Sequence, residues 1–186
     1  MNRSDEARWR AIALPYFARA GIVLTSAEAR GLEIADFGLG RFEEVGLSLH
    51  TYVNTRRVCA KELVLLPWQL CPEHSHPPVD GELGKEETFR CRWGTVHLFV
   101  DVDEEVGTRS SLRRPPDHPY LQTVSVTAAN HVTLLPGEQF TLAPDTLHWF
   151  MAGPEGAVVS EFSTRSRDAH DVFTDPQVRR QAIDGS

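Results

Sequence analysis

The chain has 186 residues, 41% hydrophobic and 24% charged, which is the composition of an ordinary globular domain. The net charge of −7, without clustered lysine and arginine, argues against a nucleic-acid partner. No apolar run approaches the roughly 20 residues that span a bilayer, and no export signal is evident, so we expect a cytoplasmic protein with no membrane partner.

The first 43 residues predict short helices. Residues 4–21 are expected to form one, with Ser4 as its N-cap and Pro15 as an interior residue that removes one hydrogen bond. The sequence TSAE at 25–28 resembles a capping box and predicts a second short helix.

From about residue 44 the sequence changes to short runs rich in β-branched and aromatic residues, many of them separated by proline, glycine or aspartate. The runs are VGLSLHTYV, KELVLLPW, TFRCRWGTVHLFVDV, QTVSVTA, HVTLL, QFTL, LHWFMA and GAVVSEFS. This rhythm predicts an antiparallel sandwich or barrel.

Two polar stretches complete the chain. Residues 103–120 predict a long surface loop, which fits a binding loop or a tolerated insertion. The polar tail that starts at Arg165 is expected to pack on the outside. We therefore predict one all-β domain over residues 1–186. Its expected parts are a helical segment packing on the barrel (1–43), the barrel itself (44–164) and a C-terminal extension (165–186).

One stretch, CPEHSHPPVDGELGKEETFRCRWG, carries residues that can ligate a metal ion. Side chains alternate along a strand, so His74 and His76 should point the same way. Glu87 lies in the next strand-like run, and His148 lies in another. Three imidazoles and a carboxylate suit Mn, Fe, Ni, Co or Zn and leave positions open for a substrate. The plainer alternative is a set of exposed or hydrogen-bonded histidines.

These residues resemble the two motifs of the cupins. The first motif is HxH, then a glutamate, six residues and a glycine, matched here by Glu87 and Gly94; the second places a histidine after a proline-containing turn, matched by Pro144 and His148. Ten residues separate His76 from Glu87 where three or four are usual, which implies an inserted loop, PPVDGELGK, at the mouth of the site. The second motif also lacks its usual glycine. The resemblance implies a double-stranded β-helix, a jelly-roll barrel.

A closer resemblance covers roughly Leu32 to Arg180. The segments PEHSHPP, GKEETFRCRWGTV, LLPGEQFTLAPDTLHWF and VVSEFSTRSRDAHDVFTDP are similar to the D-lyxose isomerase family of cupins. The resemblance implies a ketol-isomerase that interconverts D-lyxose and D-xylulose, with D-mannose and D-fructose as a second pair. It implies a divalent metal, Mn first, with Co, Zn, Fe or Ni as alternatives.

Aldose–ketose exchange needs a base and a proton shuttle. Glu161 is the expected base, because it faces inward if Val159 does, and desolvation there would raise its pKa. Lys85, two residues before Glu87, is expected to hold a sugar oxygen or to shuttle a proton. Which of the two is base and which is shuttle stays open at this point. Three further residues are expected to contact sugar hydroxyls: Arg165, Asp168 and Asp171.

Two other functions remain possible on the sequence. One is an Fe-dependent cupin dioxygenase acting on a small metabolite, and the other is a non-catalytic binding module. A dioxygenase can work without Glu161 and Lys85, because oxygen chemistry takes place at the metal. A homodimer is also expected, because Leu147, Trp149 and Met151 should form an apolar outer face that must be covered.

Overall fold

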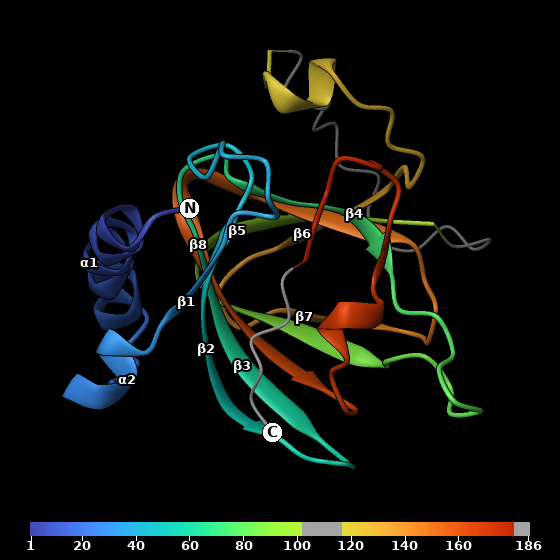
Figure 1. The fold of residues 1–186 in the computed structure, drawn as a ribbon, viewed down its shortest axis with the longest axis horizontal. Coiled ribbons are helices and arrows are strands. Elements are labelled where there is room, and N and C mark those ends of the chain that lie inside the picture. Colours follow the sequence, from blue (N-terminus) through green and yellow to red (C-terminus); the bar gives the residue numbers. More distant parts are fainter. Residues whose placement is uncertain (102–116, 181–186) are drawn as a thin grey trace.

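Two long antiparallel strands, β5 (Glu87–Val100) and β8 (His148–Ser163), form the centre of the fold. In this computed structural model, which describes residues 1–101 and 117–180, they pair from Glu87↔Ser163 to Val100↔His148. Figure 1 shows the barrel around them, with both helices on one side. The predicted jelly-roll barrel is confirmed.

The remaining elements are α1 (Arg3–Arg19), α2 (Ser26–Arg30), β1 (Glu33–Ala35), β2 (Leu47–Asn54), β3 (Cys59–Leu65), β4 (Leu70–Ser75), β6 (Asn130–Leu134), β7 (Gln139–Leu142), β9 (Val172–Phe173) and two 3₁₀ turns at Tyr120–Gln122 and Asp168–His170. The hydrogen-bonded order is β1-β2-β3-β8-β4-β9, and β5 pairs with β6, β7 and β8. Within the described ranges, no helix is long and apolar enough to cross a membrane.

Two glycines allow β5 and β8 to bend against each other. Gly94 and Gly156 have φ values of 76° and 90°, and a Cβ on Gly94 would lie 2.1 Å from the carbonyl oxygen of Gly156. Only glycine tolerates both the backbone conformation and this approach. The bend explains why LHWFMA and GAVVSEFS, predicted as two strands, form one strand across the Gly153–Gly156 segment.

The N-terminal prediction needs a correction at its cap. The side chain of Asn2, not Ser4, accepts hydrogen bonds from the first turn of α1, at 3.0 Å from the nitrogens of Ser4 and Asp5. The helix continues through Pro15. The predicted capping box before α2 is confirmed. The segment 1–43 also contains the strand β1, which pairs with β2.

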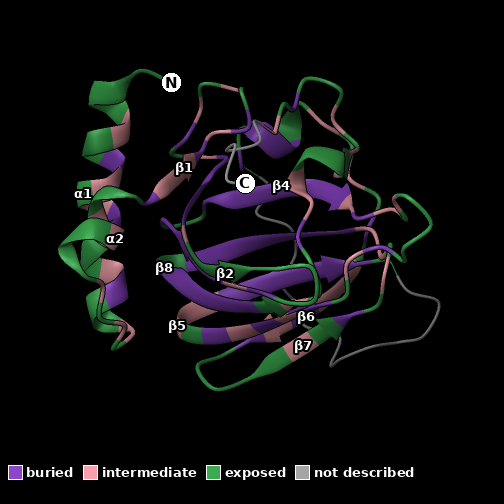
Figure 2. Ribbon diagram, turned by 60° about the horizontal axis from the view of Figure 1, so that its bottom comes forward, coloured by how far each residue is buried: buried purple, intermediate pink, exposed green. Residues whose placement is uncertain are grey.

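The core fills the barrel, where buried residues from facing strands meet (Figure 2). Helix α1 covers a second, smaller cluster from outside, packing Ala13 and Phe17 near Val64 and Val158. The cysteines Cys59, Cys71 and Cys91 are buried free thiols.

The predicted strand QTVSVTA is wrong. Its backbone bends to a buried carboxylate instead: Glu73 accepts hydrogen bonds from the nitrogens of Thr127 and Ala128, each at 2.7 Å. Those N–H groups are therefore unavailable to a strand partner. The predicted loop 103–120 lies mostly outside the described residues, but Tyr120 is buried in a 3₁₀ turn.

The apolar face that predicted a homodimer is covered by the chain itself. Trp149 stacks on Phe99 with 3.9 Å between ring centroids and donates from Nε1 to the carbonyl of Ala128 at 3.1 Å. Met151 is fully buried. A second subunit is not needed to shield these residues, so they give no reason to expect a dimer.

Up to Arg180, where the described residues end, the C-terminal tail lies mostly at the surface, as expected, but parts of it join the barrel. β9 pairs with β4, with Phe173 opposite His74, and Val178 is buried in the barrel core. The tail passes the open end of the barrel, where it reaches the residues described next.

Candidate active site

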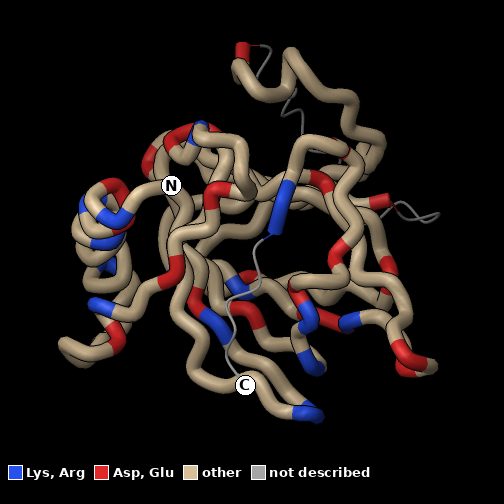
Figure 3. Tube along the Cα trace, in the orientation of Figure 1, with Lys and Arg blue, Asp and Glu red and all other residues tan. Residues whose placement is uncertain are grey.

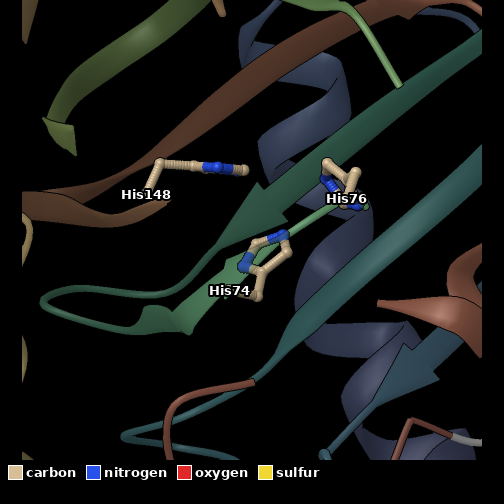
Figure 4. Close-up of side chains that lie close together, drawn as sticks. All are labelled: His74, His76 and His148. Carbon is tan, nitrogen blue, oxygen red and sulfur yellow. The ribbon is translucent and has the colours of Figure 1, made fainter. Parts of the chain in front are cut away.

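Three histidines gather inside the barrel (Figure 4). His74 is on β4, His76 directly follows that strand, and His148 begins β8, where it pairs with His74. One ligand nitrogen from each lies within 4.8 Å of the other two, and all three side chains are buried. The pleat of β4 turns both histidines of the HxH pattern to the same side, as expected.

A hydrogen bond fixes the tautomer of each imidazole. Nδ1 of His74 lies 2.7 Å from the carbonyl oxygen of Pro72. Nδ1 of His76 lies 2.6 Å from the carboxylate of Asp171, and Nδ1 of His148 lies 2.9 Å from the carbonyl oxygen of Thr146. These oxygens only accept, so Nδ1 carries the proton in each ring. The Nε2 lone pair of a neutral ring is then free to bind a cation, the arrangement found behind metal-ligating histidines.

Glu87 supplies an oxygen to the same place. Its Oε1 atom lies 3.1 Å from Nε2 of His76 and 3.1 Å from Nε2 of His148. Within the described residues, Nε2 of His148 makes no well-formed hydrogen bond although it is fully buried. Lone pairs converge here, and a cation between them would satisfy all of them. The donor set of three nitrogens and one oxygen therefore fits a divalent transition metal.

The surrounding charges shift the pKa values of His74 and His76 in opposite directions. Burial, with the nearby imidazoles of His148 and His76, holds the pKa of His74 well below its usual value, which keeps the ring neutral. Burial and Lys85 oppose protonation of His76, but Glu87 and Asp171 outweigh them and raise its pKa to about 9. A bound metal would take the place of that proton.

Glu161 lies beside this cluster, on the barrel side of β8. It is 4% exposed, and Val159 on the same strand is buried in the core, so both face inward as expected. Its Oε1 atom accepts hydrogen bonds from Lys85 at 3.2 Å and from the hydroxyl of Ser163 at 3.1 Å.

Lys85 connects the two carboxylates. Its Nζ atom lies 2.7 Å from Glu87 Oε2 and 3.2 Å from Glu161 Oε1. Burial alone would lower the pKa of Lys85, but the negative charges of Glu161 and Glu87 outweigh it and hold that pKa well above its usual value. Lys85 is therefore an ammonium cation, which can donate to an oxygen but cannot act as a base.

The three residues expected to contact hydroxyls have different surroundings. Arg165 is exposed at the mouth of the site. Asp171 faces the site but is bonded to His76, so its position favours orienting that imidazole. Asp168 lies 3.0 Å from Lys61 and 3.1 Å from Arg180; burial opposes its charge, yet these cations and Lys85 hold its pKa well below the usual range.

Sequence reasoning missed Lys61. Its Nζ atom is buried, 2.9 Å from the hydroxyl of Ser166 and 4.0 Å from Glu161. Burial opposes its charge, but Glu161 and Asp168 raise its pKa. The signal was present in the KELVL run, because Lys61 shares the inward face with Leu63.

The amino-acid sequence is similar to known proteins over most of its length. The family model described as D-lyxose isomerase matches residues 18–185. The D-lyxose ketol-isomerase of Cohnella laeviribosi is 52% identical over 167 residues, which cover 90% of this chain and 88% of that protein. The D-lyxose/D-mannose isomerase of Thermosediminibacter oceani is 52% identical over 162 residues, covering 87% and 86%.

Among solved structures, the L-ribose isomerase of Cellulomonas parahominis with L-ribose superposes with a TM-score of 0.74 at 17% identity, covering 96% of this chain and 94% of that one. At this identity the likeness concerns the fold alone. The matches to the family model and to the two relatives concern most of the chain, and the resemblance seen in the sequence is confirmed. The chain therefore belongs to the D-lyxose isomerase family and is a sugar isomerase.

Proposed function

We propose that the protein is a metal-dependent aldose–ketose isomerase that interconverts D-lyxose and D-xylulose, with D-mannose and D-fructose as a second pair. The observation that carries the proposal is the buried Lys85–Glu161 pair next to the histidine cluster. The names of the two relatives supply the sugars.

His74, His76, His148 and Glu87 would hold the metal. We propose Mn, and the same donors also accept Co, Zn, Fe or Ni. When bound, the metal would supply positive charge against the developing enediolate. His148 tests the ligand set: its Ala variant should purify without stoichiometric metal, and full occupancy would show that another residue is the fourth ligand.

Glu161 is the proposed base. Its carboxylate would take the proton from C2 of the aldose and return it to C1, so that the sugar is oxidised at one carbon and reduced at the other with no external redox partner. Lys85, held as a cation, would donate to the oxygen that gains charge and carry the hydroxyl proton between O1 and O2. Its charge supports the role of shuttle for Lys85 rather than that of base.

The Fe-dependent dioxygenase is the other candidate. It would have no use for an inward-facing glutamate bonded to a buried lysine, and burying such a pair costs desolvation energy. Membership of the isomerase family also favours the first reading. Fold alone would not separate the two, because one fold hosts many activities.

The two candidates differ in what they exchange with solvent and air. Turnover of D-lyxose in D₂O should place solvent deuterium on carbon next to the carbonyl of the ketose, with no oxygen consumed. Oxygen uptake that matches loss of the sugar would contradict the isomerase. If the ketose forms wholly without deuterium, the protein would still be an isomerase, but a carboxylate base that exchanges its proton with solvent would be excluded.

A further inference from the structure

A hollow of about 320 Å³ opens beside the proposed catalytic residues. Its lining includes the buried side chains of His76 and Lys85 and, at its outer edge, the exposed arginines Arg56, Arg57 and Arg165. Arg56 and Arg57 lie in the turn between β2 and β3, and Arg165 follows the end of β8. In Figure 3, which colours lysine and arginine blue, the tip of the β2–β3 turn is blue. The volume is within the range of small-molecule sites, roughly 300–1,000 Å³.

The cations around this hollow fall into two groups. Lys85 is paired with Glu87 and Glu161, and Arg167 is paired with Glu82 and donates to the carbonyl of Val79 at 3.0 Å. The charges of these two residues are already balanced by partners within the protein.

The second group consists of Arg56, Arg57 and Arg165, whose charges have no such partner. Within residues 1–101 and 117–180, none of the three guanidinium groups has an ion pair or donates a hydrogen bond. Three acidic residues line the same hollow. Glu82 is paired with Arg167 and Asp171 is bonded to His76, whereas Glu86 is exposed.

Three guanidinium groups without a charged partner line one hollow, in a chain whose net charge is −7. An anion bound there would supply that partner. A guanidinium group presents parallel N–H donors that match a phosphate in a bidentate manner, so arginine is the residue type best suited to such a ligand.

We propose that this rim binds the phosphate of a sugar phosphate whose carbonyl end lies at His76 and Lys85. The inference rests on the proposed function for the carbonyl end only. The phosphate ester is carried unchanged: no bond to phosphorus forms or breaks, and the aldose–ketose exchange stays balanced within the sugar. The protein would then accept terminally phosphorylated pentoses or hexoses more tightly than the neutral sugars.

Equilibrium binding to the Mn-loaded protein tests this without relying on turnover. Isothermal titration calorimetry at low ionic strength would compare D-mannose 6-phosphate, D-mannose and inorganic phosphate. We expect the sugar phosphate to bind at least tenfold more tightly than either of the other two, and the preference to shrink as salt is added.

Variants locate the anion. The preference for the sugar phosphate over D-mannose should be lost in the triple variant R56A/R57A/R165A. It should be kept in R3A/R8A, which removes two arginines from α1 that do not line the hollow. Circular dichroism would check that both variants are folded, and the R56K/R57K/R165K variant should recover part of the preference.

Three results would overturn the inference: equal affinities for D-mannose and its 6-phosphate, a preference that survives in the folded triple variant, or inorganic phosphate binding as tightly as the sugar phosphate. Failure of the proposed function looks different. In that case neutral sugars are not isomerised by the Mn-loaded protein, while the calorimetric preference for the phosphate remains.

Discussion

At the scale of single residues, the site consists of two adjacent layers of side chains. His74, His76 and His148 have their Nδ1 atoms fixed by oxygens, which leaves Nε2 for a cation. Lys85 and Glu161 lie next to them and bond to each other. The first layer suits metal chemistry in general, whereas the second suits proton transfer between neighbouring carbons.

Glu161→Gln tests the second layer. The amide keeps the size of the side chain but cannot take a proton, so kcat should fall by roughly 10² to 10⁴ while metal content and fold are kept. Glu86→Gln is the matched control, because Glu86 is an exposed carboxylate near the same mouth. Steady-state kinetics and metal analysis on both variants give the result, and normal turnover by the Glu161 variant would remove it as the base.

At the scale of elements, the insert between His76 and Glu87 brings Lys85 into the site. Arg167, from the tail, fastens it: Arg167 donates to the carbonyl of Val79 and pairs with Glu82. The insert also passes very close to the barrel at Gly84, where a Cβ would lie 1.9 Å from the carbonyl oxygen of His76.

Arg167→Ala should release the insert. We expect amide hydrogen exchange to rise in residues 79–84 and kcat/KM to fall about tenfold, equivalent to about 1.4 kcal/mol, because Lys85 is held less well. Arg167→Lys keeps the charge but cannot span both partners, so it should rescue little. Unchanged exchange in the insert would show that Arg167 does not fasten it.

The sequence predicts those parts of the site that depend on local periodicity. Alternation along a strand placed His74 with His76, and Val159 with Glu161. It failed where distant segments decide the outcome. The strand expected at 122–128 does not form, because backbone N–H groups of this segment donate to Glu73 of β4.

The tail shows the same limit. Its polar composition predicts an outside position, but Asp168 pairs with Lys61 of β3 and Arg180, and Asp171 pairs with His76. Each of these charges is stabilised by a partner far away in the sequence. Composition alone cannot identify such partners, because a buried ion pair and a solvated charge use the same residue types.

At the scale of the whole molecule, one buried histidine outside the site links stability to pH. His97 lies with Nδ1 3.3 Å from Nε2 of His131 and stacks on Trp68. Burial, with His131, lowers the pKa of His97 to about 4. In the unfolded chain the pKa of His97 is near 6.5. Between pH 6.5 and 4, His97 is therefore protonated in the unfolded chain and neutral in the folded protein.

Stability should consequently fall as the pH drops through this window. Between pH 7 and pH 5 we expect His97 to account for a loss of about 1 kcal/mol in the free energy of unfolding. Urea denaturation of the wild-type protein and of His97→Gln at both pH values measures it as a difference between the two losses. Equal losses in both proteins would exclude His97 as the cause.

We propose that a metal ion and the Lys85–Glu161 pair together isomerise a sugar without oxygen. The decisive experiment strips the protein of metal, restores Mn anaerobically and follows conversion of D-lyxose into D-xylulose. We expect no conversion by the metal-free protein and conversion once Mn is restored. Conversion that persists after complete removal of metal, or that starts only when oxygen is admitted, would contradict it.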